Sequence, residues 1–247
     1  FVDVASKVGI NFTHTFGDEH FSNLVESAGG GAAFFDYDQD GHLDLYLTTG
    51  KFDESISKGK KPNVALKNRL YRNKGDGSFV DVTDKTKVGC EGAFSMGIAV
   101  GDYNNDGYPD LYVCNYGHST LFQNKGGGSF VDVTGKAGVG NEKGCAIAAT
   151  WLDYDKDGFL DLYVGNYIEF DPQYNLFYAP DGFPGPLSYS GQSDRFYKNR
   201  GDGRFEDVSA QVGIARFKGR AMSVAASDYD GDGYDDIYVT NDAMENF

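Results

Sequence analysis

Four short acidic segments carry the side chains of this sequence that could bind a hard cation. They read DYDQDGHLD from Asp36, DYNNDGYPD from Asp102, DYDKDGFLD from Asp153 and DYDGDGYDD from Asp228. Each places carboxylate or amide oxygens at positions 1, 3, 5 and 9, with a glycine at position 6 that permits a sharp turn. Calcium takes about six to eight oxygen ligands from carboxylates, backbone carbonyls and water. The spacing therefore predicts four calcium loops.

The predicted calcium ligands occupy the same positions in every loop. The side-chain ligands are Asp36, Asp38, Asp40, Asp44, Asp102, Asn104, Asp106, Asp110, Asp153, Asp155, Asp157, Asp161, Asp228, Asp230, Asp232 and Asp236. Position 7 is expected to contribute its backbone carbonyl, which leaves its side chain free to vary; it is occupied by His42, Tyr108, Phe159 and Tyr234. The second loop has an asparagine in place of a carboxylate, and we expect it to bind calcium most weakly.

Two other interpretations of these loops have to be weighed. An EF-hand loop begins similarly, but it requires a glutamate at position 12 and flanking helices. Position 12 is instead occupied by strand-type residues, which excludes the EF-hand: Leu47, Val113, Val164 and Val239. Any one loop could be a solvated Asp/Gly turn, but four copies with one spacing favour calcium.

The charge of the chain excludes several classes of partner. Asp and Glu number 37 against 22 Lys and Arg, for a net charge of -15 over 247 residues. Such a chain repels nucleic acid and anionic membrane surfaces. Four bound dications would offset more than half of this charge. The sequence also contains no apolar run near the roughly 20 residues needed to span a bilayer, and no leader is recognisable at its start.

A second repeated segment is a hairpin, an alternation of apolar and polar residues around a glycine-rich turn. Its copies read LYRNKGDGSFVDVT from Leu70, LFQNKGGGSFVDVT from Leu121 and FYKNRGDGRFEDVS from Phe196, and FVDVAS at Phe1 is the second half of a fourth. Each hairpin starts 32 residues before the next acidic loop. The distance from an acidic loop to the next hairpin varies between 34, 19 and 43 residues, so insertions collect in one connection per repeat.

These repeats predict an all-β fold, a β-propeller of four-stranded antiparallel blades. Strands of small residues (MGIAVGD, AIAATWLD, MSVAASD) are expected innermost, followed by the acidic loop, an LDLYV-type strand, the variable connection and the hairpin. A β-sandwich is the alternative. About three and a half blades are present, and the units are approximately residues 1–29, 30–90, 91–140, 141–214 and 215–247. The chain is expected to be part of a longer one, or to have its ring completed by another chain.

The acidic pattern, DYDxDGxxDLYV after a small-residue strand, resembles the FG-GAP or VCBS repeat of integrin α-subunit propellers. A closer resemblance, to the secreted CRTAC or ASPIC/UnbV-containing family, lies in FVDVASKVGINFTH, ESAGGGAAFFDYDQDGHLDLYL, GPLSYSGQSDRFYKNRGDGRFEDVS and DYDGDGYDDIYVTNDAMENF. The resemblance implies an extracellular or periplasmic seven-bladed propeller, with further blades and a small domain after Phe247. It also implies calcium ligands at positions 1, 3, 5, 7 and 9 of the loop between the first two strands of each blade.

The connections that vary in length lie on the propeller face opposite the calcium loops, because successive strands run up and down. This insertion face is expected to hold residues 9–30, 51–69 and 167–195, and its aromatic residues would suit a protein or glycan partner. An ordered cover over the propeller is the alternative for the last segment. The leading hypothesis is a non-catalytic calcium-binding adhesion module. A carbohydrate-active enzyme and a structural subunit of a larger assembly are the alternatives. Three cysteines leave one disulfide open, such as Cys90 with Cys145.

Overall fold

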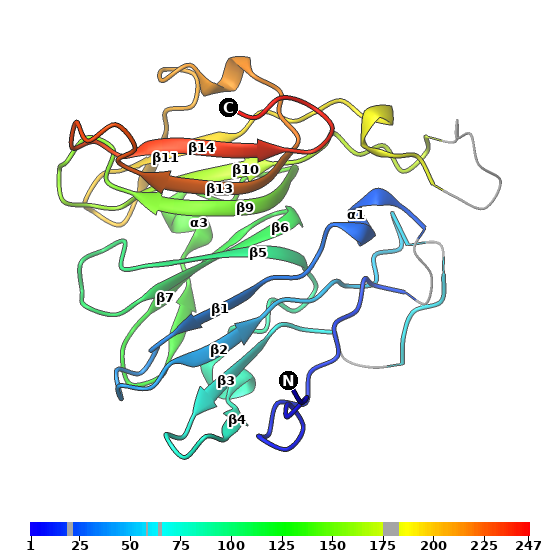
Figure 1. Cartoon of the computed structure of the whole chain (residues 1–247), viewed down its shortest axis with the longest axis vertical. Coiled ribbons are helices and arrows are strands. Elements are labelled where there is room, and N and C mark those ends of the chain that lie inside the picture. The colour runs from blue at the N-terminus through cyan, green and yellow to red at the C-terminus, as the bar shows by residue number, and fades with distance from the viewer. Residues whose placement is uncertain (19–21, 58, 64–65, 175–182) are drawn as a thin grey trace.

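The strands of the computed structural model, which describes residues 1–18, 22–57, 59–63, 66–174 and 183–247, form successive antiparallel blades that fan around part of a ring (Figure 1). The first blade is β1 (Ala32–Phe35), β2 (Asp44–Leu47), β3 (Arg69–Asn73) and β4 (Phe79–Asp81). The second is β5 (Phe94–Gly101), β6 (Asp110–Gly117), β7 (Thr120–Asn124) and β8 (Phe130–Asp132). The third is β9 (Gly144–Leu152), β10 (Asp161–Asn166), β11 (Arg195–Asn199) and β12 (Phe205–Asp207). The fourth contains β13 (Ala221–Ser227) and β14 (Asp236–Asn241).

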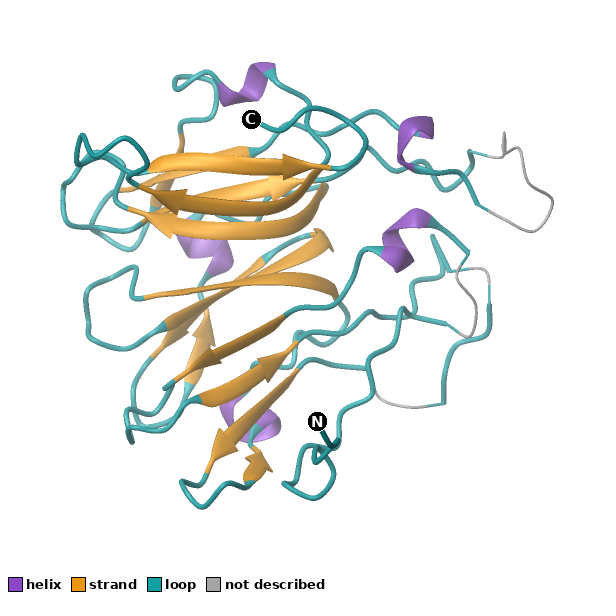
Figure 2. Cartoon of the chain, viewed as in Figure 1, coloured by secondary structure: helices purple, strands orange, loops and turns teal. Residues whose placement is uncertain are grey.

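Within each blade the strands pair in chain order, so every acidic loop joins a blade's first two strands. In the first blade Phe35 lies opposite Asp44, and in the third Leu152 lies opposite Asp161. The helices are single turns in the connections between strands (Figure 2): α1 (Leu24–Ser27), α2 (Thr83–Thr86), α3 (Thr134–Ala137) and the 3-10 turns Pro186–Ser188 and Ile214–Arg216. The predicted all-β partial propeller is confirmed, and the sandwich alternative is not what the chain forms.

The first strands of neighbouring blades approach one another closely, which is why they are built from small residues. A Cβ atom on Gly97 of β5 would lie 2.0 Å from the carbonyl oxygen of Ile147 on β9. One on Gly31, just before β1, would lie 2.5 Å from the carbonyl oxygen of Met96. No side chain fits at such a separation. The small-residue pattern thus marks the line along which the blades crowd towards the axis.

Aromatic residues of the second and third strands fill the space between blades. A tyrosine follows the first leucine of the second strand in three blades, and Tyr46, Tyr112 and Tyr163 are almost completely buried. The Tyr46 hydroxyl donates to the Val88 carbonyl at 2.6 Å, and the Tyr112 hydroxyl donates to the Val139 carbonyl at 2.9 Å. Each hydroxyl therefore stays hydrogen-bonded in an apolar layer, where an unpaired polar atom would be destabilising.

One expectation from the sequence differs from the structure. The opening residues FVDVAS were expected to form a strand, but residues 1–4 are irregular, residues 5–9 form turns, and Phe1 and Val2 are exposed. The second and third blades are linked by hydrogen bonds between strands, because β6 pairs with β9 through Tyr116 opposite Cys145 and Gly117 opposite Gly144. This short pairing joins the second and third blades into one continuous sheet.

The two ends of the strands lie on opposite faces of the molecule. In Figure 1 the four acidic loops lie together on the left, whereas α1 and the long connections between second and third strands lie on the right. Among the residues that the structure describes, no helix is long and apolar enough to cross a bilayer.

Gly97→Ala is expected to lower the free energy of unfolding by about 1–3 kcal/mol, because the new methyl group would overlap the Ile147 carbonyl oxygen. Gly135→Ala is the matched control, since its Cβ meets nothing within 4 Å and α3 favours alanine. Urea denaturation of both variants tests this. Equal losses in the two would contradict the crowding of the inner strands.

The third blade has a buried carboxylate where the first blade has a buried asparagine. Asp194 precedes β11 where Asn68 precedes β3, and it accepts hydrogen bonds from the Tyr163 hydroxyl (2.7 Å) and the Asn166 amide (2.8 Å). In the first blade, Asn68 accepts from the Thr49 amide (3.0 Å) and donates to the Tyr46 hydroxyl (3.0 Å). Burial raises the pKa of Asp194 to about 6.

Asp194→Asn is therefore expected to change how stability depends on pH. The native carboxyl keeps its proton up to about pH 6, whereas the unfolded one releases it near its ordinary pKa of 3.8. The wild type thus loses stability as pH rises from 4 to 6, by up to about 3 kcal/mol, and the variant lacks this loss. Urea denaturation at pH 4.5 and 7.5 measures it. A wild-type-minus-variant difference that is the same at both pH values would contradict the assignment.

Candidate metal sites and the insertion face

The first aspartate of each acidic loop closes the loop by accepting two backbone amides. Asp36 accepts from the amide of Asp40 at 3.0 Å and from that of Gly41 at 2.9 Å. Asp102 and Asp153 make the same pair of bonds, and Asp228 accepts from Gly231 and Gly233. The position-6 glycines have φ between +87° and +90°, a conformation that other residues rarely adopt. Hydrogen bonds from its own backbone therefore close the loop without an ion.

The aspartate at position 9 ties the acidic loop to the hairpin of the same blade. Asp44 is fully buried, and it accepts from the Tyr37 amide of the loop (3.1 Å) and from the Asn73 amide of β3 (2.8 Å). Asp110 and Asp161 make equivalent bonds and are equally buried. Burial raises the pKa of these carboxyls, to about 6 for Asp44 and Asp161 and about 7 for Asp110. A cation beside them would oppose that rise.

The position-3 side chain has an atom without a partner in each of the first three loops. Asp38 Oδ1 and Asp155 Oδ1 are inaccessible to solvent and accept no hydrogen bond. In the second loop the corresponding atom is the amide nitrogen of Asn104. A buried carboxylate oxygen without a donor is unfavourable by itself, and a cation is the partner it lacks. The donors of the first and third loops therefore fit a divalent ion.

Three loops gather their carboxylates closely enough to share an ion. The oxygens that lie within 4.8 Å of one another belong to Asp36, Asp38 and Asp40; to Asp153, Asp155 and Asp161; and to Asp228, Asp230 and Asp236. Among the described residues, the loop from Asp102 to Asp110 forms no such group of carboxylates, because Asn104 takes one of the places. In each of these three loops the group contains three of the four predicted side-chain ligands and does not include Asp44, Asp157 or Asp232; the fourth loop is exposed.

Position 7 keeps its backbone amide bonded inside the loop and its side chain outside it. The amides of His42, Tyr108, Phe159 and Tyr234 donate to the position-5 carboxylate at 2.8–3.0 Å. In the first three loops the ring lies against the glycine of the neighbouring hairpin turn, where a Cβ would come within 2.9 Å of it: Gly75, Gly126 and Gly201. The side chain at this position therefore packs on the hairpin rather than in the ion site.

Sequence reasoning missed the basic residues that reach the loops from the hairpins. Arg72 Nε lies 2.7 Å from Asp38 Oδ2, and its terminal nitrogen donates to Asp40 at 2.7 Å. At the same place in the third blade, Lys198 pairs with Asp155 and lies 3.9 Å from Asp157. The Arg72 guanidinium lowers the pKa of Asp40. The signal that could have found them is their place in the repeats LYRN and FYKN, immediately before the asparagine that holds position 9.

That asparagine is the second group that sequence reasoning missed. The Asn124 side chain donates to the Tyr37 carbonyl of the preceding blade at 2.8 Å, and the Asn199 side chain donates to the Tyr103 carbonyl at 2.8 Å. Both asparagines are buried. In the second and third blades, the hairpin is therefore hydrogen-bonded both to the acidic loop of its own blade and to the acidic loop of the blade before it.

Neighbouring acidic loops also contact one another directly through position 4. The Gln39 side chain donates to the Gly107 carbonyl, and the Asn105 side chain donates to the Gly158 carbonyl at 2.7 Å. Lys156 lies 4.0 Å from the centre of the Tyr234 ring of the next loop. The loops thus form one continuous row along their face.

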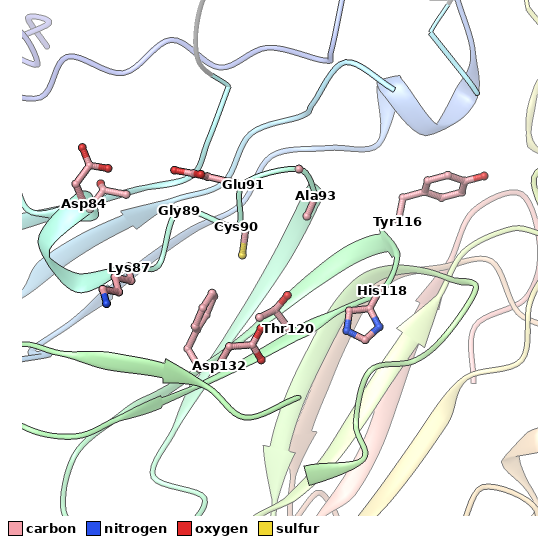
Figure 3. Close-up of a pocket in the computed structure, with 13 residues that line it drawn as sticks. Asp84, Lys87, Gly89, Cys90, Glu91, Ala93, Tyr116, His118, Thr120 and Asp132 are labelled. Atoms are coloured by element: carbon pink, nitrogen blue, oxygen red, sulfur yellow. The ribbon is translucent and has the colours of Figure 1, made fainter. Parts of the chain in front are cut away.

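A cavity of about 590 Å³ lies between the first and second blades (Figure 3). Its lining includes Cys90, His118, Phe122 and Asp132. A smaller cavity of about 400 Å³ occupies the same place between the second and third blades, lined by Tyr197 and Asp207 among others. The cavities therefore follow from the repeat of the blades.

The cysteines are free thiols in the structure, so the disulfide that the sequence left open between Cys90 and Cys145 is not formed. Burial raises the pKa of Cys90 to about 11 and that of Cys145 to about 12. Both therefore remain protonated at neutral pH. Cys145 belongs to the apolar cluster beneath the insertion face, where it acts as a small hydrophobic side chain.

The insertions pack together as a cover over one face of the propeller. Their buried residues form one cluster with the starts of β5 and β9: Leu24, Val25, Ile56, Phe94, Met96, Cys145, Ile147, Tyr167, Ile168 and Tyr189. Residues 19–21, 58, 64–65 and 175–182 of the predicted partner surface lie outside the described residues. Much of the aromatic content of residues 167–195 is thus used for packing. The aliphatic Leu187 of the same segment is instead 73% exposed.

Comparison with known proteins relates these features to a family. The profile of the FG-GAP-like repeat matches residues 36–113, 102–164 and 180–239. Cartilage acidic protein 1 of Xenopus tropicalis is 29% identical over 181 residues, which are 70% of this chain and 25% of that protein. The chain therefore spans about a quarter of the length of this curated relative.

Among solved structures, similarity extends to an Agrocybe aegerita lectin described for its specific recognition of non-reducing terminal N-acetylglucosamine. The alignment covers 86% of this chain and 60% of the lectin, at 16% identity and a TM-score of 0.35. At that score the similarity supports no argument about fold or ligand.

Proposed function

Because the chain belongs to the family of FG-GAP-like repeats, we propose that it is a non-catalytic calcium-binding β-propeller module, of the adhesion type, that binds a protein or glycan through its insertion face. The observation that supports the calcium part is the pair of buried oxygens without partners, Asp38 Oδ1 and Asp155 Oδ1. Each lies in a loop that already gathers three carboxylates within 4.8 Å.

Up to four ions would be held by the side chains at positions 1, 3, 5 and 9 and by the backbone carbonyl at position 7. When bound, calcium supplies positive charge that neutralises carboxylates which otherwise repel one another. The chain's own residues do the rest: position 1 closes the loop, and position 9 connects it to the hairpin. Calcium would therefore stabilise the packing of a blade as well as its loop.

We place the protein outside the cytoplasm, in an extracellular or periplasmic setting. Calcium sites of extracellular modules are often weak, with dissociation constants of about 10⁻⁴–10⁻³ M, and such sites are filled only where free calcium is high. The similarity to cartilage acidic protein 1 supports this setting.

The partner is expected on the exposed part of the insertion face, residues 9–30, 51–69 and 167–195. This face is built from the connections that differ most in length between repeats, and such loops commonly carry binding function on a rigid scaffold. The exposed Leu187 and the partly buried Phe170 and Tyr174 provide apolar contact area there. The calcium row lies at the other ends of the strands and would stabilise the scaffold.

Calcium removal is expected to lower the melting temperature, because an ion present at about 100 times its dissociation constant adds roughly 2.7 kcal/mol per site. Native mass spectrometry in calcium and after chelation counts the ions, and differential scanning calorimetry measures the melting temperature. Asp153→Asn should remove one ion. Asp202→Asn, in an exposed hairpin turn, is the matched control and should remove none. A chain that binds no calcium, or that melts unchanged after chelation, would refute the proposal.

Leu187→Asp is expected to weaken partner binding at least tenfold without changing the melting temperature, because the side chain is exposed on the insertion face. Deleting residues 167–195 would not test partner binding by itself, since the deletion would also remove Tyr167 and Tyr189 from the buried cluster. Val131→Asp, on the outer strand β8, is the matched control. A glycan array and pull-down from the source's extracellular fraction identify the ligand, and surface plasmon resonance compares the variants. Equal affinity of wild type and Leu187→Asp would argue against this part of the face.

A further inference from the structure

The number of carboxylates in an acidic loop matches the charge of the hairpin residue that faces it. The first and third loops have a carboxylate at position 3, and the facing residues are Arg72 and Lys198. The second loop has Asn104 at position 3, and the equivalent hairpin residue is Gln123, which is neutral. Counting only the predicted ligand carboxylates and the hairpin residue, all three sites have a formal charge of -3; the additional Lys156 of the third loop lies over the Tyr234 ring of the next loop.

We propose that Arg72 and Lys198 regulate the calcium affinity of the first and third loops by holding the position-3 carboxylate from the hairpin side. This inference rests on the proposed calcium binding and concerns how that affinity is set. Counting carboxylates alone makes the second loop the weakest of the three. Counting the basic residues as well brings the loops to a similar affinity.

The contacts show how one side chain can do this. Arg72 pairs with Oδ2 of Asp38, so that Oδ1 of the same carboxylate stays buried and unpaired. It also binds Oδ2 of Asp40, whose other oxygen accepts the His42 amide at 3.0 Å. Arg72 therefore holds two mutually repelling carboxylates together. Lys198 does the same for Asp155 and Asp157, and Asp155 Oδ1 is the atom left without a partner.

The same positive charge opposes a second cation in the loop. A dication beside Asp38 Oδ1 would lie across one carboxylate from the guanidinium, and like charges at that range repel. The Arg72 side chain is 40% exposed and Lys198 is 32% exposed, so solvent screens the repulsion and keeps it modest. Removing the charge should therefore tighten calcium binding while loosening the calcium-free loop.

The chain supplies its own matched substitutions. Arg72→Gln and Lys198→Gln place at each loop the residue that the second blade has, and they should tighten calcium binding there by about three- to tenfold. Gln123→Lys should weaken binding at the second loop by a similar factor. Arg72→Lys keeps the charge and introduces the residue that the third blade has at this place, so it should stay within about twofold of wild type.

Calcium binding can be measured at each loop separately through the NMR signal of its position-6 glycine, whose backbone amide donates to the position-1 carboxylate. Selective ¹⁵N-glycine labelling and calcium-buffered NMR titrations follow the amides of Gly41, Gly107 and Gly158. The amides of the two unaltered loops report whether a variant is folded. Lys198→Gln and Gln123→Lys test the inference independently if Arg72→Gln does not fold.

The inference predicts tighter binding only at the loop that loses its positive charge. Unchanged or weaker binding at that loop in Arg72→Gln and Lys198→Gln, with wild-type binding at the other loops, would overturn it and leave the proposed calcium binding intact. A wild-type protein whose three glycine amides do not respond to calcium would refute the proposed function, and this inference with it.

Discussion

The buried aspartate at position 9 is the interaction on which each blade depends. Its two oxygens accept one amide from the acidic loop and one from the hairpin, so a single carboxylate fixes the loop against the strand pair that follows it. Burial raises the pKa of this group in all three complete blades, and a cation beside it would oppose that rise. Folding and the proposed metal binding would thus depend on the same residue.

The blades are joined by contacts that follow from this arrangement. Because position 9 holds the hairpin asparagine by its backbone, the asparagine side chain is free to reach the preceding blade, as Asn124 does towards Tyr37. Position 4 adds a second connection at the same face, from Asn105 to Gly158. On the opposite face the insertions bury their own apolar cluster. One face is therefore organised by charge and the other by apolar packing.

The loops are also less alike in charge than their common spacing indicates. In the three complete blades, Arg72 and Lys198 compensate the two loops that have a fourth carboxylate, and the loop without it faces a neutral glutamine. A close group of like charges is stable only when something opposes the repulsion. The hairpin side chains provide part of that opposition in the calcium-free protein, and an ion would provide the rest.

The sequence by itself determined the four-stranded blade. Three features of the repeat indicate it: the fixed 32-residue interval between hairpin and acidic loop, the small residues of one strand and the aromatic residues of the next. It also predicted which oxygens could bind an ion, because nine residues around a position-6 glycine form a loop through contacts among themselves. Only the tertiary structure decided which side chains of the hairpin and of other blades face each loop. Arg72 lies 34 residues from Asp38, and the partners of Asn124 and Gln39 belong to other blades. Such contacts depend on how blades stack, a long-range packing that no local spacing encodes.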